Sequence, residues 1–307
     1  VVNSRKPDYK NVILGFINGL RKYVNNHCNT KSNYRDHHGD IKTINPAYWR
    51  DLIINDDNKE LIQSYIDRFF NKVPLFREHN IQANSTILIT GRKGSGKQML
   101  IQILCTELDI PVFRVEARYI QDGMNLFVTN KLQGIIDIYN RAYELSPSIV
   151  FIEDNDISDN KLENEVLKHI TIIDILPETK RMKSNDGILT FISTDDSSLP
   201  DKIMEAKEPL IDLTIELSYP TAAQIKAILT EKLSDKISGP DQPMIDSITR
   251  TMNGMSAEAV YDFTNRIIKR MILAGLTLID CETIENELVD FMFRCQESVK
   301  TSDGHGT

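Results

Sequence analysis

Gly91-Arg92-Lys93-Gly94-Ser95-Gly96-Lys97-Gln98 (GRKGSGKQ) is the stretch around which this chain is organised. It follows a short apolar run, residues 86–90, and precedes a segment with helical spacing of apolar residues, 99–104. A strand, a glycine-rich loop, a Gly-Lys pair and a helix form the context of a phosphate-binding P-loop. Glycines let successive backbone N–H groups turn toward a phosphate, the helix N-terminus adds positive partial charge, and Lys97 supplies a full charge. The stretch therefore predicts a site for the phosphates of a nucleotide.

Gln98 departs from the motif, which normally closes with Ser or Thr. A small hydroxyl at this position ligates Mg²⁺, whereas Gln98 offers a neutral amide oxygen on a longer side chain. A plain glycine-rich turn between a strand and a helix is the alternative interpretation of the stretch.

The composition excludes several classes of protein. With 41% hydrophobic and 26% charged residues, the 307-residue chain matches an ordinary soluble globular protein, and its net charge of −8 argues against nucleic acid as the main partner. No apolar run reaches the roughly 18 residues of a membrane helix, and no secretory signal pattern opens the chain. The chain begins with Val1 instead of Met, which fits a piece of a longer polypeptide.

The four cysteines show neither pairing nor metal-ligand spacing, which favours the cytoplasm or another reducing compartment. They are Cys28, Cys105, Cys281 and Cys295. Together with Cys28, the residues His27, His37 and His38 resemble metal ligands in type alone. Zinc sites usually show tighter paired spacings, so a solvated loop is the expected interpretation.

Short apolar runs alternate with longer helical patterns, which predicts an α/β fold with a mainly parallel sheet covered by helices on both faces. Strands are expected at residues 86–90, 112–115, 148–152, 187–194 and 210–217, and helices at 61–70 and 132–139. From residue 221 onward the pattern is helical. The expected domains are a polar N-terminal extension (1–45), an α/β nucleotide-binding domain (46–217), a small helical lid domain (218–295) and a C-terminal tail (296–307).

An acidic cluster, Glu153-Asp154-Asn155-Asp156, ends the third expected strand. At this place a P-loop NTPase holds Mg²⁺ with one carboxylate and activates the attacking water with the next, which acts as a general base. The cluster predicts a metal ligand at Glu153 and a catalytic base at Asp154. A solvated acidic loop is the alternative.

Several stretches together resemble the AAA branch of the P-loop ATPases. Residues 146–156 (SPSIVFIEDND) resemble the family's second nucleotide-binding stretch, and Thr194 stands where the family carries a polar sensor. Residues 49–52 resemble the segment before its first helix, 220–229 the start of its helical lid, and 253–260 the lid segment near the adenine. Covering about residues 46–295, the resemblance implies the AAA architecture: a P-loop NTPase parallel sheet flanked by helices, followed by a small all-helical lid.

The resemblance implies a site for ATP or ADP, with Mg²⁺ as a further ligand. Its catalytic positions are Glu153, Asp154 and Thr194; its cofactor-binding positions are Gly91, Lys93, Gly94, Ser95, Gly96, Lys97, Gln98, Met99, Ile53, Ile54, Ser256 and Ala257; its metal positions are Glu153 and Gln98.

The resemblance also implies partners: other AAA subunits, identical or different, in an oligomeric ring, and a protein substrate. Tyr119 stands about where family members grip a polypeptide with an aromatic side chain, although packing would explain this residue equally well. The glycine loop is similar to that of the first ATPase domain in tandem proteins such as the peroxisomal biogenesis ATPases, whose first domains are often degenerate.

Departures from the family pattern bear on hydrolysis. The family's acidic pair is Asp then Glu, whereas this chain has Glu153 then Asp154, and a misplacement of about 1 Å in a catalytic group can cost roughly a hundredfold in rate. The sensor, usually Asn, is Thr194. No arginine occurs between Arg181 and Arg250, where the family supplies arginine fingers worth about 10³–10⁵ in rate.

These departures favour an ATP-binding AAA module with weak or lost hydrolysis. A competent ATPase and a non-enzymatic scaffold that keeps the AAA fold remain the alternatives.

Overall fold

The computed structural model describes residues 32–116, 133–154, 172–196, 199–200, 210–238 and 241–303. The chain divides into two units. A sheet unit comprises Val1–Gly91 and Lys97–Glu216, and a helical unit comprises Arg92–Gly96 and Leu217–Thr307. The tip of the glycine loop therefore groups with the helical unit, while the two ends of the loop belong to the sheet unit. No helix in the described parts of the chain has the length and apolarity needed to cross a membrane.

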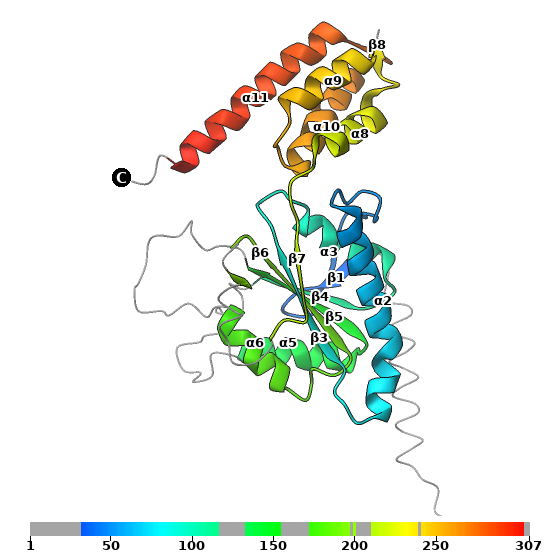
Figure 1. Ribbon diagram of the computed structural model, residues 1–307, viewed down its shortest axis with the longest axis vertical. Coiled ribbons are helices and arrows are strands. Elements are labelled where there is room, and N and C mark those ends of the chain that lie inside the picture. Colours follow the sequence, from blue (N-terminus) through cyan, green and yellow to red (C-terminus); the bar gives the residue numbers. More distant parts are fainter. Residues whose placement is uncertain are drawn as a thin grey trace, which may run out of the picture. The chain divides into compact units, whose positions relative to one another are not determined.

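The sheet unit is built on a seven-stranded sheet with the strand order β2-β1-β4-β5-β6-β3-β7 (Figure 1). Every pairing in it is parallel except that of β1 with β2, so the predicted mainly parallel sheet is confirmed. The strands are β1 (Asn33–Arg35), β2 (Ile41–Thr43), β3 (Asn84–Thr90), β4 (Val112–Glu116), β5 (Ser148–Asp154), β6 (Ile188–Thr194) and β7 (Leu213–Glu216).

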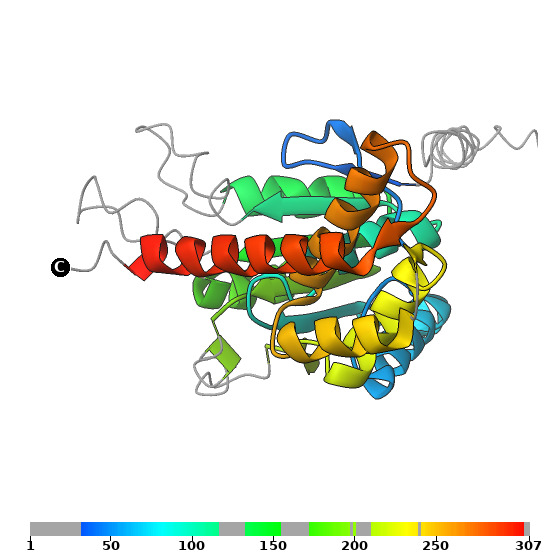
Figure 2. The same ribbon diagram turned by 90° about the horizontal axis from the view of Figure 1, so that it is seen from above.

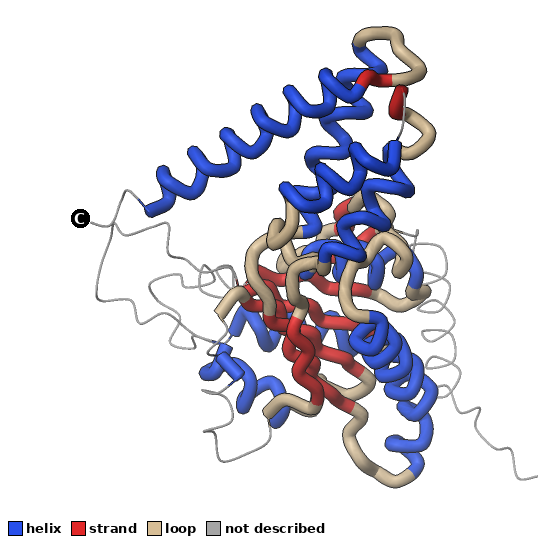
Figure 3. Tube along the Cα trace, turned by 45° about the horizontal axis from the view of Figure 1, so that its top comes forward, coloured by secondary structure: helices blue, strands red, loops and turns tan. Residues whose placement is uncertain are grey.

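Helices cover both faces of this sheet, as the alternating pattern predicts. Among its described residues, the unit contains the helices α2 (Asp56–Glu78), α3 (Lys97–Glu107), α5 (Gln133–Glu144) and α6 (Ile172–Arg181). Helices α2 and α3 lie on one face, and α5 and α6 on the other (Figures 1 and 3). The central strands are buried from both sides, which is why they appear in the sequence as continuous apolar runs.

Strand alternation sorts the buried side chains between the two faces. On the α5 face, Leu88, Val150 and Ile192 from three neighbouring strands pack with Ile138 and Tyr139 in one apolar cluster. The Tyr139 hydroxyl is paired with Thr190 Oγ1 at 2.7 Å, which satisfies the single polar group of that ring inside the core. Burial raises the pKa of Tyr139 to about 12.

Strands β1 and β2 were not expected from the sequence, because they lie within the polar N-terminal region. Each has three residues, and they form an antiparallel pair in which Asn33 is opposite Thr43. Strand β1 also pairs in parallel with β4 at Arg35 and Phe113. Part of the polar region therefore extends the main sheet.

The helical unit contains α8 (Ala222–Leu233), α9 (Asp241–Thr251), α10 (Ala257–Leu273) and α11 (Cys281–Asp303). Helix α8 begins with a capping box, in which Thr221 Oγ1 accepts from Gln224 N and the Gln224 side chain accepts from Thr221 N. Helix α11 runs as one uninterrupted helix (Figure 2). The unit is not entirely helical, because the short strands β8 (Ile237–Ser238) and β9 (Ile279–Asp280) pair in parallel.

Helices α10 and α11 are joined by a buried carboxylate. Glu287 accepts from Arg266 Nε at 3.0 Å and from Arg270 Nη1 at 2.7 Å, and the rings of Phe263 and Phe291 lie 5.6 Å apart beside them. The carboxylate is nearly covered by the two helices, so both arginines are needed to compensate its lost hydration.

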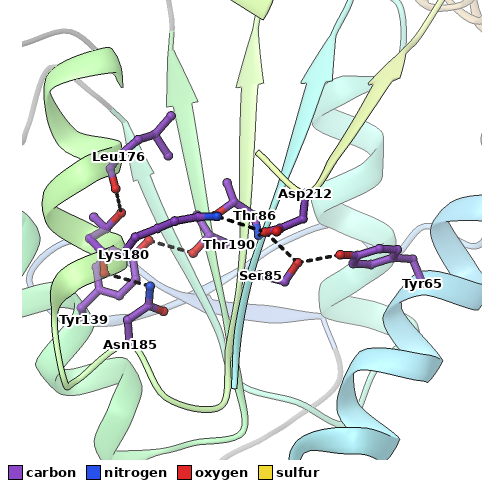
Figure 4. Close-up of polar contacts among 10 residues, drawn as sticks. Tyr65, Ser85, Thr86, Tyr139, Leu176, Lys180, Asn185, Thr190 and Asp212 are labelled. Atoms are coloured by element: carbon purple, nitrogen blue, oxygen red, sulfur yellow. Dashed lines mark hydrogen bonds and ion pairs between the residues drawn. The ribbon is translucent and has the colours of Figure 1, made fainter. Parts of the chain in front are cut away.

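Asp212 fastens the start of β3 beside the segment that leads into β7 (Figure 4). Its Oδ2 accepts from Thr86 N at 2.8 Å and from Ser85 Oγ at 3.1 Å, and lies 3.5 Å from Lys180 Nζ. Ser85 Oγ is also 2.7 Å from Tyr65 Oη on α2. One carboxylate thus connects strand β3 to helices on both faces of the sheet.

Replacing Asp212 with Ala should lower the free energy of unfolding by about 1–3 kcal/mol, because the Thr86 N–H loses its acceptor. Asp212→Asn keeps a carbonyl oxygen and should lose less. Urea denaturation measures both, with Asp67→Ala on the exposed side of α2 as the control. Equal stability of Asp212→Ala and the control would contradict this role.

Candidate functional site

The carboxyl ends of three neighbouring parallel strands lie in one row. Thr90 on β3 and Asp154 on β5 are both opposite Thr194 on β6 in the pairing register. Because the glycine loop starts directly after Thr90, the backbone positions of the predicted base and sensor lie beside the start of that loop. Strand register alone brings together residues that are up to 104 positions apart in the chain.

The glycine loop leads from β3 directly into α3, whose first residue is Lys97. The Lys97 ammonium group contacts the Gly91 carbonyl oxygen and the Asp195 carboxylate, one residue after the sensor position. Ser95 is 99% buried, and its Oγ has no hydrogen-bond partner among the described residues. A buried hydroxyl without a protein partner requires an explanation, and a ligand oxygen at the loop would supply the missing partner.

Residues 92–96 belong to the helical unit and make specific contacts within it. The Tyr219 hydroxyl donates to the Lys93 carbonyl oxygen at 3.0 Å. Gly94 has a φ of +78°, and a Cβ built on it would lie 2.8 Å from Ser256 Oγ and 2.9 Å from Ser256 Cβ. Glycine is needed at position 94 for both its backbone conformation and the space it leaves.

Ser256 has a structural role at the start of α10. Its side chain caps the helix by accepting from Ala259 N at 3.2 Å, and Ala257, the first residue of the helix, is buried. In the sheet unit, Ile54 is buried and Ile53 is half-buried, immediately before Asn55, which caps α2. The role of these four predicted residues at an adenine stays a prediction.

Glu153 is held by a residue that the sequence analysis did not single out. Its Oε2 accepts from Arg114 Nη2 on β4 at 2.8 Å, and both side chains are largely buried. Arg114 lies opposite Phe151 in the register, so Glu153, two residues further along β5, projects from the same face of the sheet. Glu153, which the sequence analysis predicts to be a metal ligand, therefore forms an ion pair with Arg114.

Comparison with known proteins agrees with this arrangement. A model of the ATPase family associated with various cellular activities (AAA) matches residues 87–219, from the P-loop strand past the end of β7. Residues 87–219 of this chain therefore form an AAA-type domain. The predicted family and fold are thereby confirmed, together with the P-loop on which they were based.

Three relatives are identical to this chain at about a quarter of the aligned positions. "ATP-dependent zinc metalloprotease FtsH 2" of Salinibacter ruber is 24% identical over 72% of the chain and 32% of that relative. "Cell division control protein 48 homolog C" of Arabidopsis thaliana is 26% identical over 69% of the chain and 27% of its own length.

A third relative is the "Probable inactive ATP-dependent zinc metalloprotease FTSHI 5, chloroplastic" of Arabidopsis thaliana. It is 24% identical over 59% of the chain and 14% of its own length. The AAA chain thus spans about a third or less of these three relatives.

The described residues do not reproduce the usual metal ligands of an AAA site. Gln98 is exposed on the first turn of α3, and Glu153 is paired with Arg114. Within the described ranges, no group of three or more His, Cys, Asp and Glu side chains is placed to hold a metal ion. The metal role of Glu153 and Gln98 stays a prediction.

Two predictions lie partly or wholly outside the described residues. The pore-loop position Tyr119 falls in residues 117–132, and His27 and Cys28 fall in residues 1–31. Of that histidine-rich group, His37 and His38 are described, and their rings lie 4.0 Å apart. The remaining loop position, Met99, is half-buried on α3.

Gly94→Ala should destabilise the AAA chain more than Gly254→Ala does. Both glycines have a similar positive φ, but a Cβ at Gly254 meets nothing within 4 Å, so this control carries only the backbone cost of about 1–2 kcal/mol. The further loss in Gly94→Ala measures crowding against Ser256. Thermal and urea unfolding test the difference, and equal losses in both variants would contradict the close contact.

Proposed function

We propose that this AAA chain binds ATP or ADP through the glycine loop and Lys97 and hydrolyses ATP slowly or not at all. The observation that carries the proposal is the loop itself, with Lys97 at the start of α3 and the buried Ser95 Oγ lacking a protein partner. Backbone N–H groups at a helix N-terminus and a lysine charge are the groups that bind phosphates in P-loops.

Weak hydrolysis is supported by the surroundings of the loop. Hydrolysis in P-loop NTPases depends on a metal beside the outer phosphates and a carboxylate that orients the attacking water. Here the carboxylate at the metal position is paired with Arg114, and the carboxylate at the base position is the shorter Asp154. The residue that follows Lys97 is an exposed glutamine, which replaces a compact hydroxyl ligand.

The setting in which this module acts is a ring of AAA subunits, identical or different, that remodels or translocates a protein substrate. The match to the AAA family supports this part of the proposal, and so do the names of relatives that describe a protease and a cell division control protein. One relative carries the name of a probable inactive ATP-dependent zinc metalloprotease, which is in keeping with weak or lost activity in this chain. The chain lacks arginines between Arg181 and Arg250, so it would contribute little to hydrolysis in a neighbouring site.

Lys97→Ala should weaken binding of a fluorescent ATP analogue at least about tenfold, because a positive charge beside the phosphates is lost. Lys269→Ala, an exposed lysine on α10, is the charge-matched control and should bind like the parent. Fluorescence titration measures both, with melting curves to show that each variant is folded. Equal affinity in parent and Lys97→Ala would rule out phosphate binding at this loop.

The thermal shift with nucleotide separates this proposal from a non-enzymatic scaffold. A ligand at 100 times its Kd should add about 2.7 kcal/mol to the stability of the native chain. A melting temperature that stays constant over millimolar ATP and ADP would favour the scaffold.

Steady-state phosphate release should be close to the blank in the parent and unchanged in Asp154→Asn. The reason is that neither the metal position nor the base position retains the family's residue. A parent rate well above the blank that falls in Asp154→Asn would instead identify a competent ATPase.

A further inference from the structure

Arg114 is a largely buried cation, with 18% of its side chain exposed, on a strand of the main sheet. It lies on β4, between Phe113 and Val115, which are both 1% exposed. Burying an isolated charge at such a place is costly, so its side chain needs a partner that compensates for lost hydration. Glu153 Oε2 at 2.8 Å supplies that partner, and the register of β4 against β5 fixes both residues on the same face.

Tyr34 on β1 completes the surroundings of the guanidinium group. The Arg114 Cζ atom lies 5.4 Å from the centroid of the Tyr34 ring, within the range of a cation–π contact. A guanidinium group keeps its proton in proteins, and Glu153 gives this one both a hydrogen bond and an opposite charge. The group is therefore a permanent positive charge that is fixed from two sides.

The pair has spare donor capacity. Arg114 Nε is buried and has no hydrogen-bond partner among the described residues. The carboxylate that Arg114 neutralises stands one residue before Asp154, whose backbone is level with the strand ends that flank the glycine loop. Arg114 thus forms an ion pair with the acidic residue, Glu153, at which an AAA site would bind its metal.

A divalent metal and Arg114 compete for the same carboxylate. For a metal to bind Glu153, the guanidinium group would have to lose the carboxylate with which it forms an ion pair inside the sheet. Breaking a buried ion pair is strongly unfavourable, since it leaves an uncompensated charge. The protein's own cation therefore has the advantage over a cation from solution.

We propose that Arg114 replaces the divalent cation as the counter-charge of Glu153, so that this site takes metal-free nucleotide as readily as the magnesium complex. The inference rests on the proposed function, because it presumes that the loop binds nucleotide. It specifies that the nucleotide binds with or without Mg²⁺, and it assigns Arg114 as the positioning residue that removes the need for the metal.

Fluorescent ATP titrations of the whole chain, one in millimolar Mg²⁺ and one in excess EDTA, test the proposal. The two dissociation constants of the parent should agree within about twofold. In Arg114→Met the carboxylate of Glu153 keeps an uncompensated negative charge near the phosphates, so ATP should bind more weakly in EDTA. Mg²⁺ should restore the affinity, so the ratio of the Kd in EDTA to the Kd in Mg²⁺ should be about ten. Glu153→Gln removes the carboxylate for which Mg²⁺ and Arg114 would compete, and should keep the ratio near one.

Arg77→Met is the matched control. Arg77 also forms an ion pair, with Asp186 at 2.9 Å, but it lies at the end of α2 near the opposite ends of the strands, so its loss should leave the ratio unchanged. Melting curves with each titration show that the variants are folded. If Arg114→Met does not fold, the parent and Glu153→Gln still decide the outcome.

The possible results separate the two claims. Parent binding that is tenfold or more tighter in Mg²⁺, with the gain lost in Glu153→Gln, would overturn the role of Arg114. A folded Arg114→Met variant with the parent's ratio would overturn it as well. Failure of the parent to bind in either buffer would instead remove the proposed nucleotide-binding function, and this inference with it.

Discussion

Parallel pairing of β3, β5 and β6 is the constraint on which the rest of this structure depends. Neighbouring parallel strands end at the same edge of a sheet, so one register sets the backbone positions of Thr90, Asp154 and Thr194 in a row. The register is in turn enforced by apolar side chains on both faces, because a shift by one residue would move each of them to the wrong face. The site is thus a consequence of how the core packs.

The sequence predicts best those features that follow from a continuous local pattern of residues. Strands β3, β5 and β6 are buried on both faces and therefore appear as apolar runs, and the glycine loop follows the first of them directly. The α/β fold, the mainly parallel sheet and the AAA family could be predicted from these patterns, and all three are confirmed.

The features that escaped prediction depend on pairing between distant segments. Strands β1 and β2 are polar and three residues long, so no local periodicity marks them, and only their pairing with each other and with β4 defines them. Arg114 looks like a single polar residue in a short apolar strand. Its partner Glu153 is 39 positions away, and spacing along the chain does not encode the register that joins them. The sequence therefore predicts the candidate residues of the site, including Glu153, but it does not predict that Arg114 pairs with Glu153.

The buried pair of Arg114 and Glu153 also constrains how the chain can change over evolutionary time. Restoring the family's Asp at position 153 would shorten the carboxylate and draw it away from the guanidinium group, whereas losing the arginine first would leave a carboxylate without its counter-charge. Either single step breaks a buried ion pair, at a cost on the order of 3–5 kcal/mol, which is a large share of the stability of a typical domain. We therefore expect the two positions to be energetically coupled, so that related chains keep or lose the two members of the pair together.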